Sequence, residues 1–140
     1  MGAPEFFTHL QKFYYFPKPL PDAYAVIDRA GKASRYFVLL IDEKTPSFTI
    51  DRLIRKYNDY YEQDDWSVTG VKFPAILVVA ETSAMGNRLT KQLVRVLRTT
   101  ESDLTIHITT LTAFLDKNSS GKVWSDVTDP DELFDLDAIS

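Results

Sequence analysis

Two aspartates and a lysine stand where apolar, strand-like runs of the sequence begin or end. Asp22 precedes the run at residues 23–27, and Asp42 follows the run at residues 36–41, with Lys44 two positions later. Carboxylate oxygens are preferred ligands of hard cations such as Mg²⁺, and a lysine can stabilise the charge that builds on a phosphate. These residues are therefore a candidate metal-dependent phosphodiesterase site, with the two aspartates as metal ligands. The alternative is that they are solvated charges at strand ends.

The composition narrows the classes of protein to consider. The chain has 140 residues, 44% of them hydrophobic, which indicates one folded domain and argues against disorder. It has no cysteine, so disulfides, zinc–thiolate sites, iron–sulfur clusters and thiol catalysis are excluded, and we expect a cytoplasmic protein. No apolar run approaches the roughly 18 residues of a membrane span, so no membrane association is predicted.

Charged residues are unevenly distributed along the chain. Residues 1–100 carry fourteen basic and eleven acidic residues, whereas residues 101–140 carry two and nine, within a net charge of −4. We interpret residues 1–6 as a possible vector remnant, residues 7–125 as one α/β domain, and residues 126–140 as an acidic C-terminal tail. Apolar residues in this tail predict that it packs back on the domain. The net charge leaves room for a local basic patch on the body.

Hydrophobic periodicity predicts the elements that must position the candidate site. The elements, in order, are an aromatic helix or arm at 7–16, strands at 23–28 and 35–42 joined by a hairpin turn, a helix at 49–61, a strand at 75–80, a helix at 84–99, a strand at 104–109 and a helical turn at 111–117. The order α-β-β-α-β-α-β predicts an α/β fold in which helices flank both faces of a mixed central sheet.

The helix at 84–99 carries a row of cations. Helical spacing places them on one stripe, opposite the leucines, and the four residues are Arg88, Lys91, Arg95 and Arg98. Such a stripe can follow the phosphates of DNA, although an ordinary solvated helix face would look the same. The start of this helix, residues 83–87, has one glycine and lacks the lysine–serine pair of a P-loop, so nucleotide binding of that kind is not expected. His107 lies between two isoleucines and is expected to be structural.

Short segments of the chain resemble the nuclease-like domain of the replication-relaxation family of plasmids and integrative elements. The matching segments, which span about residues 20–125, are LPDA at 20–23, Leu40-Ile41-Asp42 with Thr45, Arg55-Lys56 with Tyr60, FPAILVV at 73–79, and Trp124. The resemblance implies a PD-(D/E)xK nuclease-like, restriction-endonuclease-like fold and a DNA partner. It also makes Lys56 a second candidate for the catalytic lysine, because in nuclease-like folds this lysine can migrate to the helix that follows the second strand.

One position departs from the family pattern. The family's second strand usually has a glutamate two positions before its aspartate, and this chain has Leu40 there. Residues two apart on a strand share a face, so Asp42 would project on the same side, about 6–7 Å further along. The sequence Asp42-Glu43-Lys44 would then be a shifted D-x-K motif, with Glu43 directed to the opposite side, toward solvent.

Three hypotheses of function follow. The first is a DNA-associated accessory or regulatory domain of a plasmid or mobile element, with degraded catalytic capacity. The second is a Mg²⁺-dependent DNA endonuclease that uses Asp22 and Asp42 with Lys44 or Lys56. The third is a protein-interaction module on a degenerate nuclease fold, which would bind a protein partner or form a homodimer.

Overall fold

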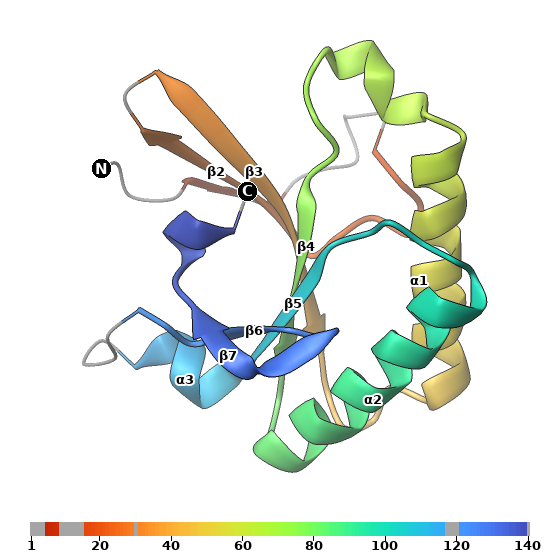
Figure 1. Ribbon diagram of the computed structural model, residues 1–140, viewed down its shortest axis with the longest axis vertical. Helices are drawn as coiled ribbons and strands as arrows, with labels where there is room; N and C mark the ends of the chain where they lie inside the picture. Colours follow the sequence, from red (N-terminus) through yellow and green to blue (C-terminus); the bar gives the residue numbers. More distant parts are fainter. Residues whose placement is uncertain (1–4, 9–15, 30, 117–120, 140) are drawn as a thin grey trace.

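A mixed β-sheet runs through the whole molecule in the computed structural model, which describes residues 5–8, 16–29, 31–116 and 121–139 (Figure 1). Within these ranges the sheet has seven strands, and their spatial order is their order in the sequence. They are β1 (Glu5–Phe7), β2 (Ala23–Arg29), β3 (Lys32–Ile41), β4 (Ala75–Ala80), β5 (Ile106–Thr110), β6 (Trp124–Asp126) and β7 (Asp129–Phe134). The predicted α/β class with a mixed sheet is confirmed.

The helices agree with the periodicity of the sequence. They are α1 (Ser47–Glu62), α2 (Ser83–Thr99) and α3 (Leu111–Leu115), with short 3₁₀ helices η2 (Asp65–Thr69) and η3 (Leu136–Ala138). The aromatic arm expected at residues 7–16 lies mostly outside the described residues, and Phe7 belongs to β1. None of the helices in the described ranges is both long and apolar enough to cross a membrane.

The type of strand pairing changes twice across the sheet, from antiparallel to parallel and back. The strands β1, β2 and β3 form an antiparallel meander, and the β2–β3 turn contains Gly31 at φ 82°, a conformation that favours glycine. The strands β3, β4 and β5 are parallel, and α1 and α2 make the two crossovers between them. The strands β6 and β7 then continue the sheet antiparallel to β5. The carboxyl ends of β3, β4 and β5 consequently meet at one edge.

The two long helices share one face of the sheet. Crossovers between parallel strands are right-handed, and the strand order advances in one direction, so α1 and α2 fall on the same side (Figure 1). Their apolar residues pack with Phe37, Ile76 and Ile106 in the larger core cluster. The expectation of helices on both faces holds only through the short α3, whose Phe114 contacts Trp124 in the second cluster.

The C-terminal segment completes the second face. The strand β6 pairs with β5, and β7 pairs with β6, so most of the segment expected to be an acidic tail extends the sheet, up to Phe134. Beyond β7, the Tyr36 hydroxyl shares its single hydrogen between the carbonyl oxygens of Leu136 (3.0 Å) and Ile139 (2.5 Å). Phe134, Leu136 and Ile139 of this segment pack in the second core cluster, as the sequence predicted, whereas Leu133 is exposed.

Candidate functional site

The two candidate metal ligands lie at the same edge of the sheet. Asp22 precedes β2, which runs antiparallel to β3, and Asp42 follows β3, so both stand at the carboxyl end of β3. One carboxylate oxygen of Asp22 accepts a hydrogen bond from the backbone N–H of Leu40 at 2.7 Å. Asp22 therefore ties the approach to β2 onto the end of β3.

Asp42 is occupied by the turn that leads into α1. Its Oδ1 accepts hydrogen bonds from the backbone N–H of Lys44 and from the hydroxyl of Thr45, both at 3.0 Å. Aspartate commonly stabilises turns in this way. The Lys44 side chain is exposed, and only its backbone contacts the Asp42 carboxylate.

A third acid, Glu81, stands beside Asp42 and was missed by the sequence analysis. Ile41 pairs with Ala80 in the parallel ladder, which makes Asp42 and Glu81 neighbours across the strand ends. Both line a small hollow of about 150 Å³. The signal was present in the sequence, because Glu81 follows the buried run of β4 as Asp42 follows that of β3.

Glu43 has a partner that its predicted direction toward solvent did not anticipate. Its carboxylate accepts a hydrogen bond from the hydroxyl of Thr82 at 2.9 Å, although Glu43 remains exposed. The Thr82 oxygen in turn accepts from the backbone N–H of Met85 at 3.2 Å and caps α2. Glu43 thus connects the loop after β3 to the first turn of α2.

These acids fit a metal centre only in part. The part of the chain that the structure describes contains no group of three or more histidine, aspartate or glutamate side chains placed to hold a metal. Leu40, at the position of the family's glutamate, is exposed and lines the same hollow as Asp42. Lys56 is exposed on α1 and, among the described side chains, forms no ion pair with either aspartate.

The carboxylates of Asp22, Asp42 and Glu81 together form what we call the acid edge of the sheet. A buried tyrosine lies close to it. The hydroxyl of Tyr57 donates a hydrogen bond to the carbonyl oxygen of Pro19 at 2.8 Å. Burial raises the pKa of Tyr57 far above its ordinary value, and the negative charge of Asp22 raises it further. Tyr57 is therefore a neutral hydrogen-bond donor that fixes the proline-rich approach to Asp22 against α1.

The cationic stripe of α2 faces solvent along its whole length. Arg88, Lys91, Arg95 and Arg98 are all exposed, and α2 contains no acidic residue. On the side of α2 that faces α1, the amide of Gln92 donates hydrogen bonds to the carbonyl oxygen of Ser47 (2.7 Å) and to the Asp51 carboxylate (2.6 Å). Residues three or four positions apart are neighbours on a helix surface, so Arg88 and Arg95 flank this seam.

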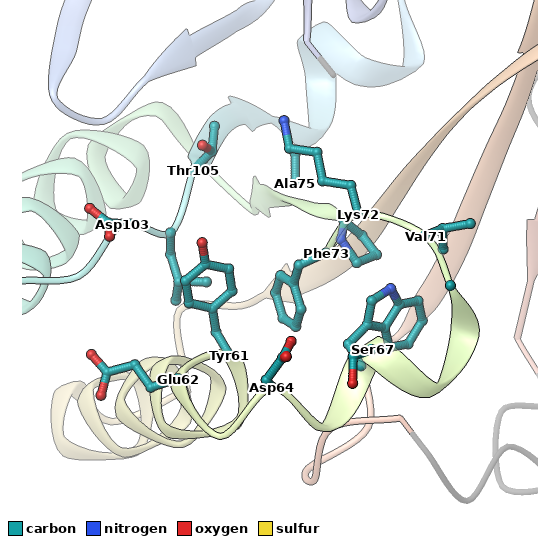
Figure 2. A pocket seen from close by; sticks show the side chains of 14 residues that line it. Tyr61, Glu62, Asp64, Ser67, Val71, Lys72, Phe73, Ala75, Asp103 and Thr105 are labelled. Carbon is teal, nitrogen blue, oxygen red and sulfur yellow. The ribbon is translucent and has the colours of Figure 1, made fainter.

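A cleft lined by several carboxylates lies at the opposite edge of the sheet, beside the amino ends of β4 and β5. It has a volume of about 680 Å³ and is walled by the rings of Tyr61 and Phe73, whose centroids are 5.1 Å apart (Figure 2). The carboxylates of Glu62, Asp64 and Asp103 surround it. This negative charge would repel phosphate, so the cleft is an unsuitable place for a DNA backbone.

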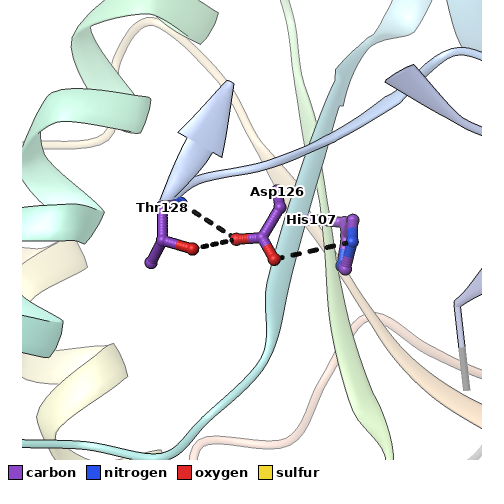
Figure 3. A network of polar contacts seen from close by, with 3 residues as sticks. All are labelled: His107, Asp126 and Thr128. Carbon is purple, nitrogen blue, oxygen red and sulfur yellow. Dashed lines mark hydrogen bonds and ion pairs between the residues drawn. The ribbon is translucent and has the colours of Figure 1, made fainter. Parts of the chain in front are cut away.

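His107 is buried on β5 and has a structural environment, as expected. Its Nε2 lies 4.0 Å from Asp126, whose other oxygen accepts hydrogen bonds from the backbone N–H and hydroxyl of Thr128 (Figure 3). Its ring meets Phe134 edge-on. Burial lowers the pKa of His107, and the negative charge of Asp126 opposes this effect in part. His107 therefore favours its neutral form.

Comparisons with known proteins identify no relative of this chain. No protein-family model, curated protein or solved structure matches the chain. The resemblance to the replication-relaxation family consequently remains a prediction that rests on the segments quoted from the sequence.

Proposed function

We propose that this domain binds DNA through α2 as a catalytically degenerate, nuclease-like accessory or regulatory domain of a plasmid or mobile element. One observation carries the proposal: α2 presents four exposed cations on one stripe and has no acid to neutralise them. The resemblance of residues 20–125 supports the nuclease-like fold and the genetic setting in this proposal.

The dimensions of the stripe suit a phosphate backbone. From Arg88 to Arg98 the helix axis rises about 15 Å, at 1.5 Å per residue. Duplex DNA carries about one charge per 1.7 Å of its axis, and neutralised phosphates release counterions. A stripe of this length would therefore contact several phosphates, and binding would weaken steeply with salt. Contacts to phosphates carry no base sequence, so we expect binding that does not depend on DNA sequence.

The state of the acid edge supports an accessory role. Asp22 and Asp42 each accept hydrogen bonds from neighbouring backbone N–H groups, and Leu40 occupies the position of the family's glutamate. These carboxylates thereby stabilise strand and turn geometry. A domain that has kept these structural contacts can keep its fold and its DNA surface without catalysis.

The test is DNA binding by fluorescence anisotropy as salt is raised from about 50 to 200 mM. We expect Arg88→Gln with Arg95→Gln to weaken binding to all sequences and to reduce the salt slope by about 0.9 for each phosphate that is no longer neutralised. Lys18→Gln with Lys32→Gln is the matched control, since it removes the same charge from exposed residues outside α2. Equal weakening in the two double variants would contradict a specific role for α2.

A Mg²⁺-dependent DNA endonuclease is the second candidate, favoured by the adjacency of Asp42 and Glu81. Mg²⁺ often uses only one or two protein carboxylates and completes its coordination with water and substrate phosphate. Calorimetric titration of Mg²⁺ and Mn²⁺ separates the two candidates. Binding that disappears in Asp42→Asn and Glu81→Gln, together with DNA cleavage, would support the endonuclease, whereas absence of any metal binding would leave the accessory role.

A further inference from the structure

A second large cleft opens at the side of β5. It has a volume of about 690 Å³ and lies between the first half of α2, the end of β5 and the β6–β7 hairpin. It forms because β6 is short: in the described ladder it pairs only with His107 and Ile108, whereas β5 continues to Thr110. The volume is within the range of about 300–1,000 Å³ that small-molecule sites occupy.

A buried hydroxyl without a partner lies at this cleft. Thr109 lines it, is only 6% exposed, and within the described residues its Oγ1 makes no hydrogen bond. Buried polar groups are nearly always hydrogen-bonded, so this hydroxyl, which is enclosed just behind the wall of the cleft, is a group that a polar atom entering the cleft would satisfy once the wall gives way. A ligand oxygen that reached Thr109 would supply the missing partner.

The walls of the cleft combine cations with apolar surface. Lys91 of α2 and Lys122, which precedes β6, both line it and are both exposed, against one acid, Asp131. The apolar part includes Val123 and Leu133, and Leu133 is 55% exposed. Two lysines beside an apolar wall suit an anion that carries a flat, poorly hydrated group.

We propose that this cleft binds one unpaired nucleotide, with its phosphate near Lys91 and Lys122, its base against Val123 and Leu133, and a polar atom at the Thr109 hydroxyl. The site uses no P-loop, in agreement with the sequence. The inference rests on the proposed function, because Lys91 belongs both to the cationic stripe and to the cleft. A DNA strand held along α2 would therefore have its next nucleotide at the mouth of the cleft.

The experiment compares a labelled single strand with a blunt duplex of the same sequence and length, by anisotropy at low salt. Thymidine monophosphate and inorganic phosphate serve as competitors. Lys122→Gln and Thr109→Val change the cleft alone, while Arg98→Gln, on the stripe but outside the cleft lining, is the matched control. Circular dichroism and thermal unfolding check that each variant is folded.

We expect the single strand to bind about tenfold more tightly than the duplex. Lys122→Gln and Thr109→Val should each weaken single-strand binding about three- to tenfold and leave duplex binding unchanged. Arg98→Gln should weaken both nucleic acids alike. Thymidine monophosphate should displace the single strand at concentrations at which inorganic phosphate does not, because the base also contacts the cleft.

The contrary outcomes separate the two proposals. Equal binding of duplex and single strand, or equal weakening of both in Lys122→Gln, would overturn the nucleotide cleft and leave DNA binding by α2 intact. Binding of thymidine monophosphate that needs Lys122, with no binding of either nucleic acid, would support the cleft as a site for free nucleotide and overturn the function proposed for α2. Absence of binding by nucleotide and by both nucleic acids would overturn both.

Discussion

At the scale of single residues, Asp22 shows how a structural role and a catalytic appearance coincide. A carboxylate at a strand end can ligate a metal, but here it also accepts the backbone N–H of Leu40. The two roles need different things from the side chain: a metal needs the negative charge, whereas the N–H needs only an oxygen. Substitutions that remove one and keep the other can therefore tell them apart.

We predict that Asp22→Ala lowers the free energy of unfolding by about 1 kcal/mol, because the Leu40 N–H loses its acceptor. Asp22→Asn keeps an oxygen in place and should cost less than half as much. Urea denaturation measures both, with Asp28→Ala as a control at an exposed aspartate within β2. Equal destabilisation by the alanine and asparagine variants would show that the charge, and not the hydrogen bond, holds this position.

The stability of the protein should depend on pH through His107. Burial lowers its pKa in the folded protein more than Asp126 raises it, so below about pH 6.5, the ordinary histidine pKa, the unfolded chain binds a proton that the folded protein resists. The stability that neutral His107 contributes should therefore be fully present above that pH, and the free energy of unfolding should fall as the pH drops through it.

This pH dependence is measured by urea denaturation between about pH 5 and 7.5. His107→Gln should flatten the dependence, because it removes the group whose pKa burial lowers. A dependence unchanged in His107→Gln would mean that other groups titrate in this range.

At the scale of elements, the local pattern of apolar residues predicts helices and strands correctly where their burial is periodic. The helix predicted at 84–99 is α2 at Ser83–Thr99, because Leu89, Leu93 and Val96 recur on its buried side. The strand predicted at 75–80 is β4, an unbroken apolar run that is buried on both faces. The strand predicted at 104–109 begins two residues later, at Ile106.

The elements and contacts that the sequence did not predict depend on distant partners. The exposed, acidic strand β7 lacks the apolar alternation of a half-buried strand and is ordered by its pairing with β6. The bond between Asp22 and Leu40 depends on the β2–β3 register, and the Thr109 cleft depends on where β6 stops. The sequence could therefore predict the acids and the cationic stripe. It could not predict the hydrogen bonds that the acids accept, or the existence of the cleft.

The docking of the C-terminal segment should depend on Tyr36. Tyr36→Phe removes the hydroxyl whose hydrogen is shared by the carbonyl oxygens of Leu136 and Ile139, and should lower the free energy of unfolding by about 1–2 kcal/mol. Carboxypeptidase should then digest the segment faster. Tyr61→Phe is the matched control, because the Tyr61 hydroxyl makes no hydrogen bond among the described residues. Unchanged digestion would show that the segment is held by other contacts.

At the scale of the whole molecule, the sheet separates two hydrophobic clusters but also joins them. Alternate residues of β3 and β4 belong to opposite clusters, as Phe37 and Val38 do. Because the same strands form both faces, one face cannot unfold without disrupting the other. The domain should consequently unfold in one cooperative step.

The two tryptophans of the sequence allow a direct test of this cooperativity. Trp66 is buried in the cluster under α1 and α2, and Trp124 in the cluster on the other face. In Trp66→Phe and Trp124→Phe, the remaining tryptophan reports one face. We expect the fluorescence transition in each variant to coincide with that from circular dichroism. Separate midpoints for the two probes within one variant would indicate that the faces unfold independently.

The acidic strand β7 has a consequence for how copies of this protein meet. It is the last strand of the sheet, and an outer strand offers unpaired backbone groups to any passing strand. Here the offered strand begins Asp129-Pro130-Asp131-Glu132. Proline cannot donate to a new ladder, and a second copy would bring like charges together. The negative charge that the sequence concentrates near its end thus opposes fibre-like association at this edge of the sheet.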